Sequence, residues 1–264
     1  MRRHVDDLGV ELTVAEVPRR VVSLVPSLTE TLEVSSSGRL VGVTDYCTHP
    51  AGLQLPTVGG SKYPKLAEIL ACEPDLVLAN SEENRPTDVQ WLREQGIAVW
   101  VMAAPATVPD ALESLRRLLM GPFELAEPDW LRTATRVWQQ PMAWRASALV
   151  PVWRKPWVVL GSETFAGDVL YRLGVSNIYA DSAERYPRPT IAQLRARVAD
   201  EPAKLLVLPD EPYEFTADDG PGFFPDTPYV LISGRYLTWY GPSLVEAYHE
   251  LSAALEAAVP PGDR

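Results

Sequence analysis

The sequence has 264 residues, of which 46% are hydrophobic and 22% charged, enough to bury one large or two small cores. Its formal net charge of -11 opposes binding to nucleic acid and to anionic lipid, so neither partner is expected. No apolar run reaches the roughly 20 residues that span a bilayer, and no signal peptide is recognisable. We therefore expect a cytoplasmic location, with an extracellular or membrane-anchored one as the alternative if the start is truncated.

The first clear element is the stretch RVVSLVPSLTETL, residues 20–32. Its apolar, β-branched run predicts a buried strand that ends at Pro26 and passes into a short helix. Ser27 and Glu30 have the S-x-x-E spacing of a capping box, in which the hydroxyl accepts a hydrogen bond from a helical N–H. We therefore expect Ser27 to cap this helix.

Further strands and helices alternate along both halves of the chain. In the first half, strands and helices are predicted in residues 38–46, 62–84 and 96–119. The second half repeats this plan in residues 157–174, 174–182, 185–213 and 229–255. A basic-Tyr-Pro turn recurs at Lys62-Tyr63-Pro64 and Arg185-Tyr186-Pro187. This alternation predicts βαβ units with parallel sheets.

The predicted fold class is α/β, with two lobes that each carry a mainly parallel sheet of about four or five strands flanked by helices. We expect an N-terminal lobe over residues 1–122, a connector helix over 123–147 and a C-terminal lobe over 148–264. The connector is predicted from a helical apolar stripe between Leu131 and Trp138.

Parallel sheets bind ligands at the carboxyl ends of their strands, where helix N-termini present free N–H groups. Two lobes that face each other would place their strand-end loops across one ligand cleft. These loops are residues 26–29, 45–49, 59–63 and 80–85 in the first lobe, and 162–165, 185–186, 210–215 and 235–240 in the second. Their aromatic and arginine content fits a ring-bearing ligand with polar edges.

Several segments resemble one family, unit by unit. RVVSLVPSLTETL, GRLVGVTDY, VGGSKYPKLAEILACEPDLVLA and GVSNIYADS are similar to the substrate-binding proteins of cobalamin and siderophore ABC importers, a class III periplasmic-binding-protein-like family. YCTHP, TFAGDVL and LTWYGPSL resemble its actinobacterial branch, the helical-backbone metal receptors. The resemblance implies two lobes joined by a rigid helix, with a corrinoid, a haem or a metal chelate such as a ferric siderophore bound between them.

The resemblance also implies roles for single residues. Tyr46 matches a tyrosine after the second strand of the first lobe in cobalamin-binding members, and Phe165 matches an aromatic residue of the second lobe. Family members carry one permease-docking glutamate on each lobe, where this sequence has Ala67 and Ala192. We therefore expect a cytoplasmic, non-transport ligand-binding protein. An importer component and an enzyme acting on such a ligand are the alternatives.

The predicted ligand-contacting residues lie in the strand-end loops. They are Tyr46, Lys62, Tyr63, Asn84, Arg85, Phe165, Arg185, Tyr186, Glu211, Tyr213, Arg235, Trp239 and Tyr240. The other interpretation of the tyrosines is that they cover the lobe cores. Arg85 and Arg235 also have two interpretations: they clamp a ligand carboxylate, or they form salt bridges to neighbouring acids. The remaining tryptophans in predicted strands and helices, Trp153 among them, are expected to be packing residues.

Acidic pairs follow one strand in each half, Glu82–Glu83 in the first and Asp210–Glu211 in the second. They are interpreted either as solvated loop charge, favourable near a helix N-terminus, or as contacts to a cationic or metal-bearing ligand. Both interpretations stay open at this point.

Cys47 and His49 form a C-x-H pair that offers two metal ligands, or one axial ligand to a bound cobalt or iron. A closed structural zinc site is not expected, because the chain has only three histidines. No catalytic residue is predicted, since the sequence has no nucleotide-binding, zinc-protease or nucleophile-elbow motif. The only cofactor expected is the ligand itself: a corrinoid, a haem or a metal chelate.

Overall fold

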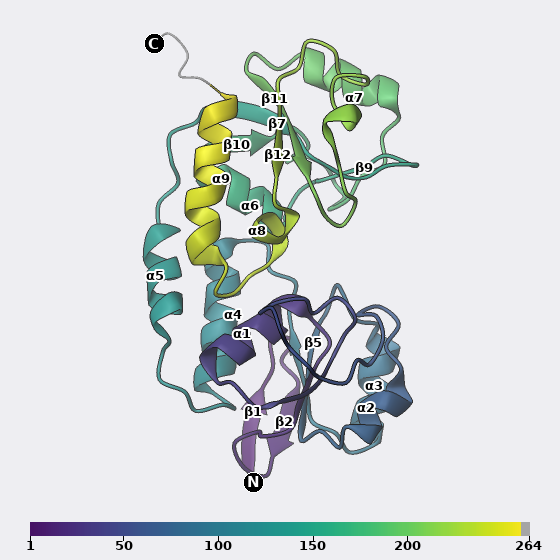
Figure 1. Ribbon diagram of the computed structural model, residues 1–264, viewed down its shortest axis with the longest axis vertical. Helices are drawn as coiled ribbons and strands as arrows, with labels where there is room; N and C mark the ends of the chain where they lie inside the picture. Colours follow the sequence, from purple (N-terminus) through teal and green to yellow (C-terminus); the bar gives the residue numbers. More distant parts are fainter. Residues whose placement is uncertain (260–264) are drawn as a thin grey trace. The chain divides into compact units, whose positions relative to one another are not determined.

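The computed structural model describes residues 1–259 and has an α/β architecture (Figure 1). It divides into two compact units, which we describe separately. The first unit comprises residues 1–104, 112–132 and 240–242, and the second comprises residues 105–111, 133–239 and those from Ser243 on. The predicted lobe boundaries at residues 122/123 and 147/148 stay predictions. The last five residues of the predicted C-terminal lobe lie outside the described residues.

The first unit contains a four-stranded parallel sheet in the order β4–β3–β5–β6. Its strands are β3 (Val21–Ser23), β4 (Leu40–Val43), β5 (Leu76–Asn80) and β6 (Val99–Met102). Helices α1 (Pro26–Ser35), α2 (Leu66–Ala71) and α3 (Pro86–Glu94) connect them. Every residue of β3, β5 and β6 is buried, as expected for parallel strands covered on both faces.

The second unit contains another four-stranded parallel sheet, in the order β10–β7–β11–β12. Its strands are β7 (Ala146–Leu149), β10 (Val175–Asn177), β11 (Lys204–Pro209) and β12 (Tyr229–Ile232). Its helices are α6 (Phe165–Arg172), α7 (Ile191–Ala199), η1 (Ala217–Asp219), α8 (Gly234–Thr238) and α9 (Leu244–Ala258). In both sheets the first strand along the chain lies between the second and the third. The predicted α/β class with parallel sheets is confirmed.

Two helices carry residues of both units. These are α4 (Val108–Met120) and α5 (Asp129–Val137). Within the predicted connector range the structure has helix α5, and the last two residues of that range, Ala146 and Ser147, already belong to β7. The rigidity of this connection stays a prediction. Among the described residues, no helix has the length and apolar character needed to cross a bilayer.

Helix α1 does not begin as the sequence predicted. Its N-cap residue is Val25, whose apolar side chain cannot accept a hydrogen bond from a helical N–H. Pro26 occupies the first turn. Proline suits that position because its fixed φ is helical and it has no N–H left unpaired. Ser27 therefore falls inside the helix, where it is 3% exposed, and Glu30 is 5% exposed. The predicted capping box is wrong.

Two antiparallel hairpins lie outside the main sheets: β1 (Arg2–Val5) with β2 (Glu11–Val14), and β8 (Pro151–Trp153) with β9 (Val158–Val159). The repeat between the two halves of the sequence predicts that the apolar run at Val158 is the first strand of the second half. The structure gives that place to β7 and inserts the β8–β9 hairpin between β7 and α6. Val159 is fully buried in this hairpin, so an apolar pattern could not distinguish the two pairings.

Candidate ligand-binding site

In the first unit, a buried asparagine joins the loops at the carboxyl edge of the sheet. Asn84, 4% exposed, accepts a 2.7 Å hydrogen bond at Oδ1 from the N–H of Asn80, the last residue of β5. Its Nδ2 donates to the carbonyl of Ser61 at 2.8 Å. The N–H of Asp45, after β4, donates to the carbonyl of Gly59 at 2.9 Å. The loop after β4, the loop before α2 and the loop after β5 therefore form one connected surface.

Two tyrosine rings project from this surface. Tyr46 is 64% exposed and Tyr63 is 68% exposed. Gly60 lies against the first ring, since a Cβ built on it would be 3.4 Å from the Tyr46 side chain. The predicted ligand contact Lys62 lies in the same surface and is exposed. Exposed aromatic rings at a sheet's carboxyl edge are suited to contact a ring-bearing ligand.

Arg85 is engaged within the first unit. Its Nε and Nη2 donate to the two carboxylate oxygens of Asp88, each at 2.8 Å. Its Cζ lies 4.8 Å from the centroid of the Tyr63 ring, a cation–π distance. The geometry therefore matches the salt-bridge interpretation of Arg85, and the guanidinium supports the exposed Tyr63 ring.

Two predicted ligand contacts are interior residues of the first unit. One is Asn84, as described above. The other is Tyr240, which is 5% exposed and accepts a 2.7 Å hydrogen bond at its hydroxyl from Nδ2 of Asn80. Burial raises the pKa of Tyr240 well above its usual value, and the nearby charge of Glu83 raises it further. Both side chains position the loops of the carboxyl edge.

Glu83 is the half-buried acid of this edge. Burial, followed by the charge of Glu82, raises the pKa of Glu83 to about 7. The carboxyl group is therefore balanced between its neutral and its charged form near neutral pH. Glu83 also raises the pKa of the Cys47 thiol, although burial is the larger cause there.

Cys47 lies among hydroxyl groups. Its Sγ is 3.0 Å from Oγ1 of Thr29 and 3.2 Å from Oγ1 of Thr44. Nδ1 of His49 is 3.0 Å from Oγ1 of Thr48. Within residues 1–259, His, Cys, Asp and Glu side chains do not form a group of three or more that could hold a metal ion. A metal role for Cys47 and His49 stays a prediction.

In the second unit, another strand-end asparagine organises the loops. Nδ2 of Asn177, at the end of β10, donates to the carbonyls of Leu160 and Gly161 at 3.0 and 2.9 Å. The N–H of Gly161 donates to the carbonyl of Arg185 at 2.8 Å. A Cβ on Gly161 would lie 2.1 Å from the carbonyl oxygen of Glu184, so this close approach requires glycine.

The predicted contacts in these loops differ in exposure. Tyr186 is 39% exposed, whereas Phe165, the first residue of α6, is 6% exposed and packs inside the unit. Arg185 is half-buried and donates from Nη1 to the carbonyl of Glu163. Tyr186 therefore presents the accessible ring of this group.

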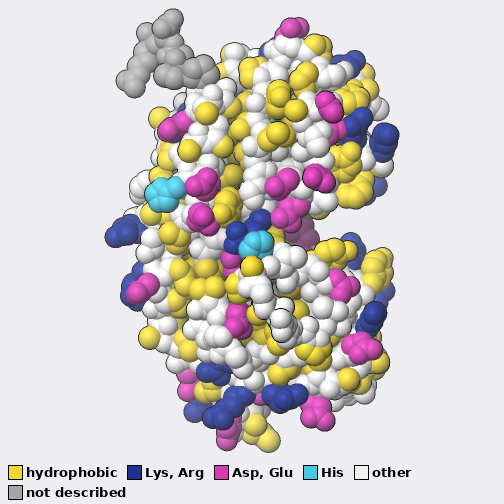
Figure 2. Space-filling model, viewed as in Figure 1, with side chains coloured by type: hydrophobic (Ala, Val, Ile, Leu, Met, Phe, Trp, Pro, Cys, Tyr) yellow, Lys and Arg dark blue, Asp and Glu magenta, His cyan; other side chains and the backbone are white. Residues whose placement is uncertain are grey.

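An acidic loop and an arginine meet beside α8. Asp210 accepts a 2.6 Å hydrogen bond from the N–H of Gly234. Burial, and then the charge of Asp210, raise the pKa of Glu211, while Arg235 lowers it. Cζ of Arg235 lies 5.3 Å from the Tyr236 ring centroid and 5.5 Å from that of Trp239, which is 9% exposed. Figure 2 shows Asp and Glu side chains gathered on the second unit around α8.

Trp153 was expected to be a packing residue, but it is 45% exposed on the β8–β9 hairpin. Its ring centroid is 5.6 Å from that of Tyr213, in an edge-to-face arrangement. The next residue, Arg154, forms an ion pair with buried Asp219 and anchors the hairpin. No sequence signal identified Trp153, because its position depends on the hairpin pairing.

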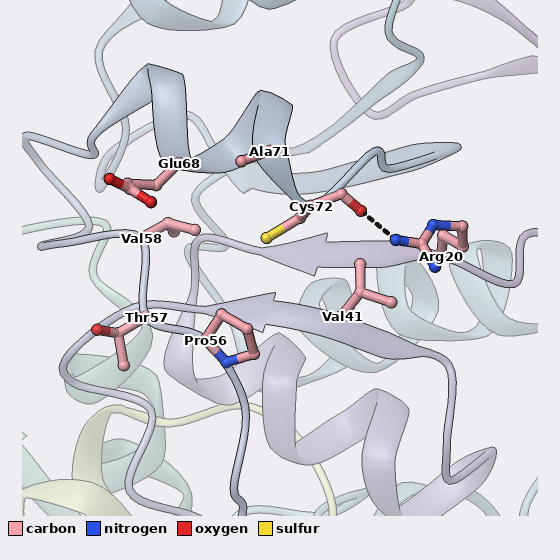
Figure 3. Close-up of a pocket in the computed structure, with 8 residues that line it drawn as sticks. All are labelled: Arg20, Val41, Pro56, Thr57, Val58, Glu68, Ala71 and Cys72. Carbon is pink, nitrogen blue, oxygen red and sulfur yellow. Dashed lines mark hydrogen bonds between the residues drawn. The ribbon is translucent and has the colours of Figure 1, made fainter.

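A pocket of about 260 Å³ lies elsewhere in the first unit (Figure 3). Arg20 and Val41, which line it, stand at the amino ends of β3 and β4, and Glu68 and Cys72 come from α2 and its C-terminal end. Nη2 of Arg20 donates to the carbonyl of Cys72 at 2.6 Å. Pro56, Thr57 and Val58 also line it, and Thr57 pairs with Val43 at the end of β4. The lining contains none of the predicted ligand contacts.

The fold places the chain in the class of proteins built from two α/β units, each with a parallel sheet. No family model matches the sequence. The chain is 27% identical over 187 residues to a vitamin B12-binding protein of Vibrio cholerae serotype O1, covering 66% of each chain. It is 24% identical over 256 residues to the vitamin B12-binding protein of Pectobacterium carotovorum, covering 92% of this chain and 91% of that one.

Several solved structures have the same fold as this chain. The periplasmic vitamin B12-binding protein of Vibrio cholerae has a TM-score of 0.69 at 19% identity, covering 93% of this chain and 99% of that one. A periplasmic haem-binding protein of Pseudomonas aeruginosa has a TM-score of 0.73 at 24% identity, covering 93% and 94%. The resemblance to class III periplasmic-binding-protein-like proteins is confirmed.

The predicted cytoplasmic location is wrong. The structural relatives are periplasmic, and a further relative, 27% identical over 116 residues, is an ABC transporter substrate-binding lipoprotein of Bacillus subtilis. That similarity covers 43% of this chain and 37% of the lipoprotein. These relatives point to a location outside the cytoplasm. Their names describe substrate-binding proteins, which confirms the prediction of a binding protein rather than an enzyme.

Proposed function

We propose that this chain binds a corrinoid or a haem through the loops at the carboxyl edges of its sheets, in a compartment outside the cytoplasm. The observation that supports this most directly is the set of exposed rings at those edges, Tyr46 and Tyr63 in the first unit and Tyr186 in the second. Flat macrocycles gain contact area by packing against such rings. The names of the relatives, which bind vitamin B12 or haem, support the same ligand class.

We divide the candidate residues by accessibility. Apart from the half-buried arginines, Arg85, Arg185 and Arg235, which contact protein groups, ligand contact is assigned to the exposed or half-buried side chains. These are Tyr46, Lys62, Tyr63, Trp153, Tyr186, Glu211 and Tyr213. Asn84 and Tyr240 are interior and are assigned to loop positioning. That loops of both units contact the same ligand molecule stays a prediction.

Absorbance titration of the purified protein tests this function. Cyanocobalamin, cobinamide, haem and a ferric siderophore are added separately, and we expect a saturable band shift with a corrinoid or with haem. Calorimetry of the same mixtures gives the stoichiometry. Binding of the siderophore alone, or of none of the four ligands, would contradict the proposal.

The second candidate function is that of the receptor subunit of an importer, which the lipoprotein relative favours. We propose that docking to a permease does not use paired glutamates here. Ala67 and Ala192 are the second residues of α2 and α7, and both are exposed. A pull-down with host ABC permeases in nanodiscs compares the wild type with the Ala67→Glu/Ala192→Glu variant. Strong retention of the wild type, unchanged in the variant, supports the proposal. Weak retention of the wild type with much stronger retention of the variant contradicts it.

A further inference from the structure

The strand-end loops carry an excess of carboxylates in each unit. In the first unit, residues 45–49, 59–63 and 80–85 contain Asp45, Glu82 and Glu83 against Lys62 and Arg85. In the second unit, residues 162–165, 185–186, 210–215 and 235–240 contain Glu163, Asp210, Glu211 and Glu214 against Arg185 and Arg235. At a pH above the pKa of Glu83, which is about 7, carboxylates therefore outnumber cationic side chains in the loops of each edge.

The arginines of these loops are already engaged by protein groups. The Arg85 guanidinium forms two 2.8 Å hydrogen bonds to Asp88, the bidentate geometry that a ligand carboxylate would need. Arg185 donates to the carbonyl of Glu163, and Arg235 has cation–π contacts with Tyr236 and Trp239. An anionic ligand group would therefore have to compete with the Asp88 carboxylate for the guanidinium of Arg85.

Two of the acids are placed where their electrostatic interaction with a ligand would be strongest. Glu83 and Glu211 are half-buried, and each has a second acid beside it in the chain. Partial burial lowers the local dielectric constant, so a ligand carboxylate close to either side chain would be repelled more strongly than in bulk water. An amide N–H would instead find a hydrogen-bond acceptor there.

Resting on the proposed function, we infer that this chain selects tetrapyrrole-type ligands whose rim carries amides, as corrinoids do, over ligands whose rim carries carboxylates, as haem does. Like charges set against each other disfavour a partner, and such repulsion contributes to specificity together with attractive contacts. The acidic pairs Glu82–Glu83 and Asp210–Glu211 are the specificity determinants, and the aromatic rings supply contact area to either ligand.

The test compares ligands that differ only in rim charge. Cobinamide is compared with a corrinoid whose side-chain amides are hydrolysed to carboxylates, and haem dimethyl ester with haem. We expect the member of each pair whose rim has no carboxylates to bind at least about 10-fold more tightly at low salt, and this affinity ratio to shrink as ionic strength screens the charges. Equal or tighter binding of the carboxylate member overturns the inference. Failure of all four ligands to bind overturns the proposed function, and the inference with it.

Variants assign the effect to the named acids. Glu83→Gln/Glu211→Gln retains hydrogen-bonding groups but removes both carboxyl groups. At a pH above the pKa of Glu83, we expect this variant to reduce the affinity ratio between the two members of each ligand pair by at least about 3-fold, chiefly by improving binding of the carboxylate member. Glu94→Gln is the control, because Glu94 is exposed on α3 and pairs with Gln90. An unchanged ratio in the double variant overturns the role of the acidic pairs.

Discussion

The N–H of Asn80 donates a 2.7 Å hydrogen bond to Oδ1 of Asn84, which lies four residues further on. This contact closes the turn after β5. The amide of Asn84 then reaches the Ser61 carbonyl, and the amide of Asn80 reaches the Tyr240 hydroxyl. One pair of side chains therefore sets the positions of three segments that are distant in sequence.

Replacing Asn84 tests this arrangement. Asn84→Ala would leave the buried Asn80 N–H and Ser61 carbonyl without these partners, and we expect a loss of about 1–3 kcal/mol in the free energy of unfolding. Asn84→Asp keeps the acceptor but loses the donor. Urea denaturation measures both variants, and wild-type stability of Asn84→Ala would contradict the positioning role.

Replacing the exposed tyrosines should affect ligand binding and leave stability almost unchanged, in contrast to replacing Asn84. Tyr46 and Tyr63 are 64% and 68% exposed, so Tyr46→Ala and Tyr63→Ala should change the free energy of unfolding by less than about 0.5 kcal/mol. We expect each to weaken corrinoid or haem binding about 10-fold, because a stacked ring is lost. Calorimetric titration measures the affinity. The control is Tyr171→Ala, 56% exposed in the last turn of α6, which should bind like the wild type.

Stability should depend on pH through Glu83. Its pKa rises from 4.5 in the unfolded chain to about 7 in the folded protein. Between these values the folded state holds a proton that the unfolded state has released, so this group makes the free energy of unfolding fall as pH rises. The total loss from pH 4.5 to above pH 7 is about 3 kcal/mol, and little of it is present below pH 4.5.

Glu83→Gln should remove the part of the pH dependence of stability that arises from this carboxyl group. We expect the variant to be more stable than the wild type above pH 7 and similar to it near pH 4.5, in urea denaturation at a series of pH values. Glu94→Gln is again the control. Parallel pH profiles for wild type and Glu83→Gln would show that burial does not raise this pKa.

The close approach at Gly161 gives a prediction for the second unit. Gly161→Ala places a Cβ 2.1 Å from the Glu184 carbonyl oxygen and must displace the loop that carries Arg185 and Tyr186. We expect a loss of about 1–3 kcal/mol in thermal or urea denaturation, together with weaker ligand binding. Gly222→Ala is the control, because its Cβ would be 3.7 Å from the nearest atom, an ordinary contact. Equal stability of the two variants would contradict this prediction.

The α/β class, the two parallel sheets and the loops at their carboxyl ends could all be predicted from the amino-acid sequence. These follow from local signals: apolar strand runs, helical periodicity and turn residues all act over a few neighbours. The repeat of strand and helix in the two halves also predicted an α/β fold with two parallel sheets. The exposed tyrosines at positions 46, 63 and 186 lie in loops that the sequence already marked.

The accessibility of the individual loop residues could not be predicted, because it depends on contacts between distant segments. Asn84 and Tyr240 look like surface residues in sequence, but contacts with segments as far as 160 positions away bury them. Trp153 looks like a core residue, yet hairpin pairing of β8 with β9 leaves it exposed beside Tyr213. Burial depends on partners that are distant along the chain, and a local pattern does not encode them.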